Sequence, residues 1–289
     1  MKEPIFTGTC TALVTPFLNG KVNYPLLEVL LRRQIDAGIH SVVLCGTTGE
    51  SPTLSDNEKL EIIHRSKAFA GNQLTIIAGT GSNDTAHTIS LSKAAAEVGA
   101  DGLLIVTPYY NKATPDGLYK HYTAIAKNVK IPIILYNVPT RTGVDIPISV
   151  YRELADLPNI IGVKEAAADI TKIVRIRHYC PGDFHIWSGN DDMTVPILSV
   201  GGQGVISVLS NLYPNYVAEM TTAALHGDYT KAGQLQVRLS PLLKALFHEV
   251  NPIPIKAAMQ LTGFDCGSCR MPLTSASDET LQLLREAML

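Results

Sequence analysis

The sequence has no excess of basic residues. Lys and Arg number 24 against 26 Asp and Glu, which gives a net charge of −2. Nucleic-acid-binding domains are typically basic, so we expect no nucleic-acid partner. Long apolar runs are missing as well, since no stretch of about 18 uncharged apolar residues occurs. No apolar run follows a basic start near the first residue, so we expect neither a secretory signal nor a membrane segment.

Metal and redox motifs are incomplete. The chain has five scattered cysteines, and such an odd set indicates reduced thiols in the cytoplasm. Cys266 and Cys269 have C-x-x-C spacing, but no second pair completes a metal site. The eight histidines follow no zinc pattern. We therefore expect a cytoplasmic protein without a bound metal.

Apolar residues, by contrast, are abundant. Hydrophobic residues make up 46% of the chain and charged residues 17%, which allows a large core and excludes disorder. A length of 289 residues favours two domains as a general rule, but single α/β barrels of about 250 residues are a known exception.

Short segments rich in Val, Ile and Leu recur along the chain. They do not alternate with polar residues, which is typical of parallel strands covered by helices on both faces. The segments are 9–14, 41–44, 74–78, 102–106, 131–135, 160–163, 184–187 and 204–206.

Helical segments with clear end signals lie between these predicted strands. Ser55 and Glu58 form a capping box, which predicts a helix start. Gly38, Gly99 and Gly201 each stand where a helix would end and the chain would turn into the next strand, a position that favours the left-handed conformation. The repeated pattern indicates successive strand–helix units.

Strand–helix alternation at a spacing of about 30 residues predicts right-handed βαβ units. About eight units fit before residue 226. We therefore predict a TIM (β/α)8 barrel over residues 1–226, with additional C-terminal helices over 227–289 packed on the barrel. An open doubly wound sheet is the alternative. The absence of G-x-G-x-x-G after the first strand argues against a dinucleotide-binding version of that fold.

The active site of such a barrel lies at the C-terminal ends of its strands. Polar or reactive residues follow nearly every predicted strand, beginning at Cys45, Thr107, Tyr136, Lys164 and Ser188. A purely structural role does not require this arrangement. It indicates that the barrel mouth carries chemistry.

Lys164 ends an apolar strand within "NIIGVKEAAAD". It could be a snorkelling lysine or a partner of Glu165. However, its stem must enter the barrel mouth, and loss of water there favours the neutral amine over the ammonium. A neutral lysine can attack a ketone and form a Schiff base.

Three hydroxyl residues and an arginine could assist Lys164. Tyr136 ends the preceding strand, so its phenol could lie near the amine and move protons, unless it is only a core tyrosine. Thr47 and Tyr110 could extend a proton relay. Arg141 could grip a carboxylate with two hydrogen bonds, or it could form a surface salt bridge.

The loop "CGTTGES", residues 45–51, is rich in glycine and follows a strand. It lacks the G-K-[ST] ending of a P-loop. Its backbone N–H groups and threonine hydroxyls could surround a small anion. A carboxylate suits the loop as well as a phosphate does.

The motifs "GTTGES", "PYYNK", "YNVPTRTG", "VKEA" and "GVISV", in this order, resemble the dihydrodipicolinate synthase family. This family belongs to the pyruvate-dependent class I aldolases, and the resemblance covers essentially the whole chain. It implies a TIM barrel with a Schiff-base lysine at Lys164 and a proton donor and acceptor at Tyr136. Thr47 and Tyr110 would complete the relay, with Tyr110 reaching into a neighbouring subunit's site.

The resemblance also implies the substrates and the assembly. Thr48 and Ile206 would hold pyruvate, and Arg141 would bind the carboxylate of L-aspartate 4-semialdehyde. A lyase of this type needs neither a metal nor an organic cofactor, because the lysine is the electron sink. The product would feed diaminopimelate and lysine biosynthesis. A homotetramer built as a dimer of dimers is usual in the family.

Two other functions remain open. A sister aldolase, either N-acetylneuraminate lyase or a 2-keto-3-deoxy sugar acid lyase, would share Lys164 and Tyr136 but accept a polyhydroxy aldehyde. Arg141 and the pair Thr47-Thr48 favour the synthase. A barrel that keeps pyruvate binding but acts as a sensor is the second alternative, and the retained set of site residues disfavours it.

The resemblance also bears on feedback control. Feedback-sensitive members bind lysine between subunits, near the positions of Ser51, Pro52, Asp56, Lys59, Asn83, His87 and Tyr109. In those members histidines stand at positions 56 and 59 and a glutamate at 87. Here Asp56, Lys59 and His87 replace them, which removes a carboxylate partner for lysine's ammonium and adds a repelling charge. We expect weak or absent inhibition by lysine.

Overall fold

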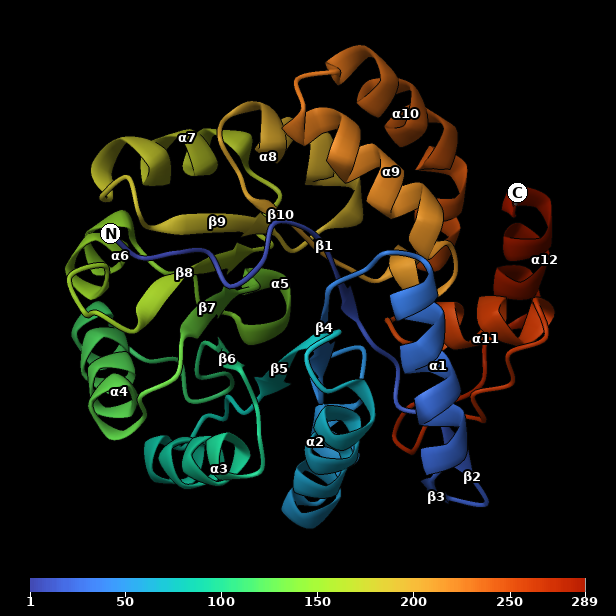
Figure 1. The fold of residues 1–289 in the computed structure, drawn as a ribbon, viewed down its shortest axis with the longest axis horizontal. Helices are drawn as coiled ribbons and strands as arrows, with labels where there is room; N and C mark the ends of the chain where they lie inside the picture. Colours follow the sequence, from blue (N-terminus) through green and yellow to red (C-terminus); the bar gives the residue numbers. More distant parts are fainter. Residues whose placement is uncertain (289) are drawn as a thin grey trace.

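A computed structural model describes residues 1–288. Its centre is a closed barrel of eight parallel strands (Figure 1). The order around the barrel is β1-β10-β9-β8-β7-β6-β5-β4, so each strand pairs with its neighbours in sequence and β1 closes the ring against both β10 and β4. The predicted TIM barrel is confirmed, and the open doubly wound sheet is wrong. The barrel strands are β1 (Gly8–Ala12), β4 (Ser41–Leu44), β5 (Thr75–Gly79), β6 (Gly102–Val106), β7 (Ile133–Asn137), β8 (Ile160–Glu165), β9 (His185–Ser188) and β10 (Gly204–Ser207).

Helices surround the barrel and follow its strands, and all of them except α9, which comes after the last strand, connect one strand to the next (Figure 1). The barrel helices are α1 (Tyr24–Asp36), α2 (Asp56–Ala70), α3 (Thr85–Glu97), α4 (Pro115–Asn128), α6 (Ile148–Leu154), α7 (Ile170–Tyr179), α8 (Thr194–Ser199) and α9 (Pro214–Leu225). The capping box predicted at Ser55 and Glu58 begins α2. Gly38, Gly99 and Gly201 all have positive φ just after their helices, as the sequence pattern predicts.

Smaller elements decorate the barrel. The strands β2 (Phe17–Leu18) and β3 (Lys21–Val22) form a hairpin after β1, and α5 (Pro139–Thr142) is a single turn after β7. Three 3-10 turns, η1 (Ser51–Thr53), η2 (Asp191–Met193) and η3 (Leu209–Asn211), follow β4, β9 and β10. All of these elements lie in segments that follow the C-terminal end of a barrel strand.

Two apolar cores explain why the strands show no alternation in sequence. Side chains such as Val43 and Trp187 fill the barrel interior, and side chains such as Val42 and Ile186 pack outward under the helices. Both faces of each strand are therefore buried, and burial on both faces favours apolar residues at every position.

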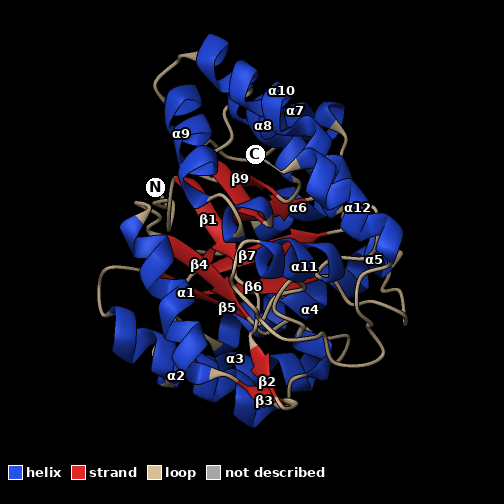
Figure 2. Cartoon of the chain, turned by 90° about the vertical axis from the view of Figure 1, so that its right-hand side faces the viewer, coloured by secondary structure: helices blue, strands red, loops and turns tan. Residues whose placement is uncertain are grey.

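The chain ends with α10 (Tyr229–Leu246), α11 (Ile253–Leu261) and α12 (Asp278–Ala287). Helix α10 packs against α8 and α9, while α11 and α12 contact α10 and each other. Figure 2 shows α11 in front of the barrel strands. Additional C-terminal helices were predicted, and the break between α9 and α10 falls at residues 226–228. The division into a barrel over 1–226 and an extension over 227–289 stays a prediction.

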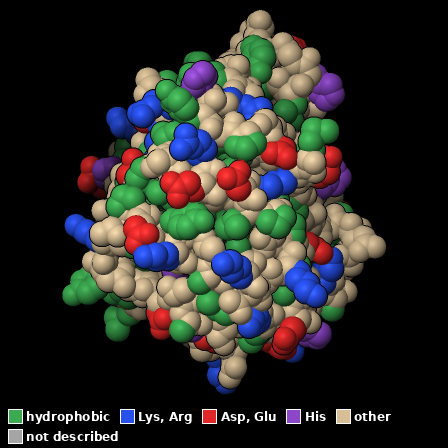
Figure 3. Space-filling view, turned by 90° about the vertical axis from the view of Figure 1, so that its left-hand side faces the viewer, with side chains coloured by type: hydrophobic (Ala, Val, Ile, Leu, Met, Phe, Trp, Pro, Cys, Tyr) green, Lys and Arg blue, Asp and Glu red, His purple; other side chains and the backbone are tan. Residues whose placement is uncertain are grey.

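None of the helices within residues 1–288 has both the length and the apolar character needed to cross a membrane. On the face shown in Figure 3, basic and acidic side chains are interspersed. That distribution matches the near balance of charges in the sequence.

Candidate active site

Tyr136 and Lys164 lie side by side at the C-terminal end of the barrel. They are paired in register between β7 and β8, and Lys164 is paired in turn with Trp187 of β9. The Lys164 Nζ atom lies 4.3 Å from the centre of the Tyr136 ring. The adjacency expected from the sequence is therefore present, although both residues lie inside their strands rather than after them.

A bulge in β8 turns Lys164 toward the interior. Two successive residues of β7 pair with Ile160 and Gly162, so Ile161 is an extra residue in β8. Ile160 packs in the outer core and Ile161 in the barrel interior. Regular alternation would then place Val163 inside and Lys164 outside. Because of the extra residue, Val163 packs in the outer core and Lys164 faces the interior beside Tyr136.

The environment of Lys164 is apolar and almost closed. The residue is 5% exposed. Among the described residues, the buried lysines Lys59, Lys172 and Lys256 each form an ion pair, whereas no carboxylate lies within 4 Å of the Lys164 amine. The amine therefore lies inside the barrel against the Tyr136 ring, a position suited to a nucleophile that attacks a carbonyl carbon.

Asp191 is a buried carboxylate near this amine, but it is already occupied. It accepts hydrogen bonds from the Ser207 hydroxyl at 2.5 Å and from the backbone N–H groups of Val208 and Leu209. Burial raises the pKa of Asp191 in spite of these donors. Its role is to hold the end of β10.

A cavity of about 740 Å³ opens beside Tyr136. Thr47 and Arg141 line its wall together with Tyr136, so three of the residues predicted from the sequence meet there. The cavity continues along η1 and the start of α2, where Asp56 and His87 line it. The loop after β4 lines the same cavity through Gly46, Thr47 and Glu50.

The two residues expected to hold pyruvate lie behind the cavity wall. Thr48 is buried, and its hydroxyl accepts a hydrogen bond from Asn251 Nδ2 at 3.0 Å. Ile206 is fully buried in the barrel interior, in the same apolar cluster as Tyr136 and Trp187. Both are close to the site, but neither forms the cavity surface in the single chain.

Tyr110 is the predicted residue that the single chain does not bring into the site. It is 91% exposed, and its backbone has a positive φ of 70°. Its neighbour Tyr109 lines the cavity, whereas Tyr110 does not. A relay of Thr47, Tyr136 and Tyr110 is therefore not assembled within one chain.

Glu165 faces the outer side of β8 and fixes the strand there. Its Oε1 accepts hydrogen bonds from Asn137 Nδ2 at 2.7 Å and from the Ala167 N–H at 3.0 Å. Its Oε2 accepts one from the Tyr151 hydroxyl at 2.8 Å and lies 3.4 Å from Lys172 Nζ. Burial raises the pKa of Glu165 despite these partners. This carboxylate anchors β8 to β7, α6 and α7 directly beside Lys164.

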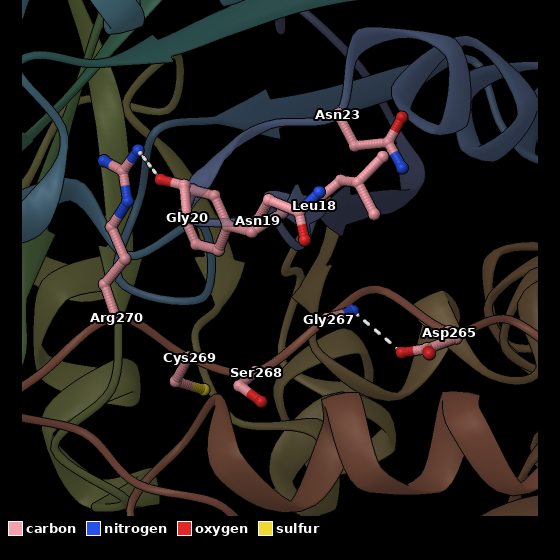
Figure 4. A pocket seen from close by; sticks show the side chains of 10 residues that line it. Leu18, Asn19, Gly20, Asn23, Asp265, Gly267, Ser268, Cys269 and Arg270 are labelled. Carbon is pink, nitrogen blue, oxygen red and sulfur yellow. Dashed lines mark hydrogen bonds between the residues drawn. The ribbon is translucent and has the colours of Figure 1, made fainter.

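A second hollow, of about 420 Å³, lies between the β2–β3 hairpin and residues 265–270 (Figure 4). Figure 4 shows Arg270 donating to the Gly20 carbonyl and the Gly267 N–H donating to Asp265. Cys269 borders this hollow, and both it and Cys266 are free thiols. Burial raises the pKa of each thiol to about 11. Within residues 1–288 there is no cluster of His, Cys, Asp and Glu able to hold a metal ion.

Comparison with known proteins places the chain in a family. The sequence profile of the dihydrodipicolinate synthetase family matches residues 5–288. The chain belongs to this family. A 4-hydroxy-tetrahydrodipicolinate synthase of Acetivibrio thermocellus is 46% identical over 288 residues, which are 100% of this chain and 98% of that protein.

Solved structures agree with this assignment. The dihydrodipicolinate synthase of Thermotoga maritima superposes with a TM-score of 0.97 at 42% identity, over 99% of this chain and 98% of that one. The chloride-inhibited dihydrodipicolinate synthase of Acinetobacter baumannii, complexed with pyruvate, has a TM-score of 0.96 at 40% identity and covers 98% of both chains.

Sequence reasoning missed several polar residues of this family member's site. Asn251 binds Thr48, and its carbonyl accepts a hydrogen bond from Arg141. Lys256 and Glu50 form a buried ion pair at 2.6 Å. Asn251 and Lys256 stand at the two ends of "NPIPIK", and polar residues that flank a short apolar segment were the available signal.

Proposed function

We propose that this chain is a 4-hydroxy-tetrahydrodipicolinate synthase, which condenses pyruvate with L-aspartate 4-semialdehyde and closes the ring. The observation that carries the proposal is the position of Lys164. Its amine lies in an apolar barrel interior against the Tyr136 ring, beside a cavity that Thr47 and Arg141 also line. A desolvated amine beside a phenol suits Schiff-base chemistry on a ketone.

The reaction begins when the Lys164 amine attacks the C2 carbonyl of pyruvate. Tyr136 donates a proton to the resulting alkoxide, and water leaves to give the imine. Loss of a proton from the pyruvate methyl group, with the imine nitrogen as electron sink, produces an enamine. Tyr136 is placed to move these protons because its ring lies against the amine.

Carbon–carbon bond formation follows. The enamine carbon attacks the aldehyde of L-aspartate 4-semialdehyde, and the alkoxide formed takes up a proton. The substrate's own amino group then attacks the imine carbon and displaces Lys164, which closes the ring. One water is released overall and Lys164 is regenerated, so neither a metal nor an organic cofactor takes part.

The carboxylates of both substrates need cationic or N–H partners. Arg141 reaches the cavity from α5 and binds the carboxylate of the semialdehyde. Thr48, with the backbone of loop 45–51, binds the carboxylate of pyruvate. Ile206 closes the barrel interior below the imine.

Tyr110 favours an assembly of several subunits. The side chain of Tyr110 is 91% exposed, and contact with a second subunit would remove the apolar part of its ring from water. Tyr110 therefore completes the relay of Thr47 and Tyr136 in a partner's site, and the protein is a homotetramer formed as a dimer of dimers. Its place is the cytoplasm, in diaminopimelate and lysine biosynthesis.

Trapping with pyruvate and sodium borohydride tests the proposal. We expect a mass adduct on Lys164 in the wild type and none in Lys164→Arg. Steady-state rates with pyruvate and either L-aspartate 4-semialdehyde or N-acetylmannosamine separate the synthase from a sister aldolase. Absence of the Lys164 adduct would disprove the Schiff-base mechanism. Faster turnover of N-acetylmannosamine than of L-aspartate 4-semialdehyde would disprove the substrate assignment.

A further inference from the structure

We propose that residues 251–256, the end of the connection between α10 and α11 together with the first turn of α11, are a positioning element for the substrate pocket, with Asn251 as its central residue. The proposal rests on the function proposed above. It assigns a role in substrate binding to the C-terminal helices, which otherwise only cover the barrel. Three contacts carry it, one to each of Thr48, Arg141 and Glu50.

Asn251 touches both substrate-binding residues. It is 5% exposed and lines the cavity. Its side-chain Nδ2 donates to the Thr48 hydroxyl at 3.0 Å, and its backbone carbonyl accepts from Arg141 Nη2 at 3.3 Å. One residue therefore fixes the orientation of a threonine on β4's loop and an arginine on α5.

The direction of the Asn251–Thr48 hydrogen bond has a chemical consequence. Because the amide N–H donates, the Thr48 oxygen is the acceptor and its own O–H is left to donate elsewhere. A substrate carboxylate is an acceptor-only group and matches that free donor. An acceptor at position 251 would instead take the Thr48 proton and remove the donor from the pocket.

Lys256 anchors the same segment through charge. Its Nζ lies 2.6 Å from Glu50 Oε1, and both side chains are almost fully buried. The two atoms are not aligned as a hydrogen bond, so the contact is a buried ion pair held by charge. Lys256 also lies 4.3 Å from the centre of the Phe17 ring. Removing one partner of such a pair leaves a buried uncompensated charge.

Glu50 transmits this anchor to the loop that carries Thr47 and Thr48. Its N–H donates to the Thr47 carbonyl at 3.1 Å, and its φ is 57°. Its second oxygen, Oε2, accepts the Arg270 N–H at 2.8 Å. Both carboxylate oxygens of Glu50 are thus held by residues of the C-terminal extension. These contacts also fix the position of loop 45–51, which carries Thr47 and Thr48.

The two parts of the segment predict different kinetic effects. A change in the Asn251 side chain acts on Thr48 but leaves the backbone carbonyl that binds Arg141. It should raise the KM for pyruvate far more than the KM for the semialdehyde. Loss of the Lys256 anchor displaces the whole segment and should raise both KM values.

Asn251→Ala and Asn251→Asp test the first part, with Asn215→Asp on the exposed surface of α9 as the matched control. We expect the KM for pyruvate to rise about tenfold or more in both Asn251 variants, while the KM for the semialdehyde stays within about twofold. In Asn251→Asp the increase in the KM for pyruvate over the wild-type value should become smaller as the pH is lowered, because the introduced carboxyl is then protonated. A merely structural role would not produce that pH dependence.

Lys256→Met tests the second part, with Lys244→Met on exposed α10 as its control. We expect both KM values to rise at least fivefold and the Glu50→Gln, Lys256→Met double variant to recover part of the loss, because it leaves no buried charge unpaired. Thermal unfolding and sedimentation of each variant exclude a loss of folding or assembly. Should Asn251→Ala not fold, the isosteric Asn251→Asp carries the test.

The outcomes separate this proposal from the proposed function. A wild type without a borohydride adduct overturns the function, and pyruvate affinity by calorimetry then still reports on Asn251. A wild type with the adduct, together with folded Asn251 variants whose pyruvate KM is unchanged, overturns the positioning role alone.

Discussion

Tyr136 and Lys164 are paired in register on adjacent strands, with the amine 4.3 Å from the centre of the phenol ring. The ring therefore supports the lysine and its hydroxyl is free to act on protons. Replacing Tyr136 with Phe keeps the support and removes only the hydroxyl. We expect kcat to fall about 100-fold or more, while Lys164 still forms an adduct with pyruvate. Stopped-assay kinetics and borohydride trapping measure the two effects, and an unchanged kcat would remove Tyr136 from the proton path.

Gly162 lies at the bulge in β8 and packs closely against the backbone of β9. A Cβ atom at this position would lie 2.1 Å from the His185 carbonyl oxygen, so the backbone of β8 or β9 would have to move. We expect Gly162→Ala to lower the free energy of unfolding by roughly 2 kcal/mol and to slow trapping at Lys164. Gly182→Ala is the control, because its Cβ would meet nothing within 4 Å. Urea titration of both variants gives the comparison, and equal stabilities would contradict a tight packing role for Gly162.

Much of the barrel could be predicted from the sequence, because apolar segments and glycine helix ends are local signals. The predicted strands ended at residues 135 and 163, whereas β7 continues to Asn137 and β8 to Glu165. The predicted strands ended too early because polar residues follow the apolar segments. Backbone pairing in a parallel sheet does not depend on side-chain polarity, so the strands continue through these residues. The bulge was also missed, since an extra residue is defined only against the partner strand.

The site was predicted unevenly for a similar reason. Tyr136 lies at the C-terminal end of β7, and Thr47 and Arg141 lie in the segments that follow β4 and β7, so closure of the barrel brings all three to one cavity. Asn251 meets Thr48 across 203 positions of sequence, through the packing of a helix outside the barrel. The periodicity of apolar residues along the sequence does not predict a contact between residues so far apart. Any contact of Tyr110 with a second subunit likewise cannot be predicted from patterns along the sequence of one chain.

Tyr110 provides a test of subunit assembly. If it serves a partner's site, mixed dimers of Tyr110→Phe and Lys164→Arg contain one complete site, because the Lys164→Arg subunit supplies its Tyr110 to the intact lysine of the other. We expect activity to rise when the two inactive variants are dissociated, mixed and reassembled. Each variant reassembled alone is the control. A mixture no more active than its parents would place Tyr110 outside the partner's site.

Asp56 bears on inhibition by L-lysine. Its Oδ2 lies 2.7 Å from His87 Nε2 and its Oδ1 lies 3.5 Å from Lys59 Nζ. The carboxylate is thus shared by two basic groups, and Lys59 would repel an incoming ammonium. We expect activity to persist in sub-millimolar L-lysine. The triple variant Asp56→His, Lys59→His and His87→Glu should gain inhibition, and half-inhibition of the wild type at sub-millimolar lysine would disprove the expectation.

His121 should make the protein less stable in mild acid. It is buried on α4, with Nδ1 2.9 Å from the Thr85 hydroxyl and no hydrogen-bond partner for Nε2 among the described residues. Burial lowers the pKa of His121 to about 4, below its ordinary value of 6.5. Between these values the unfolded chain binds a proton that the folded chain excludes. The free energy of unfolding should therefore be highest above pH 6.5 and should fall as the pH approaches 4, by at most about 3 kcal/mol.

Urea titrations of the wild type at pH 7.5 and pH 5, at one protein concentration, measure this loss of stability. His121→Gln removes the titrating group, so the variant should lose less stability over the same interval even if it is less stable at pH 7.5. His64→Gln changes an exposed histidine on α2 and is the matched control, which should keep the wild-type dependence. If His121→Gln loses as much stability as the wild type between the two pH values, another buried group causes the acid sensitivity.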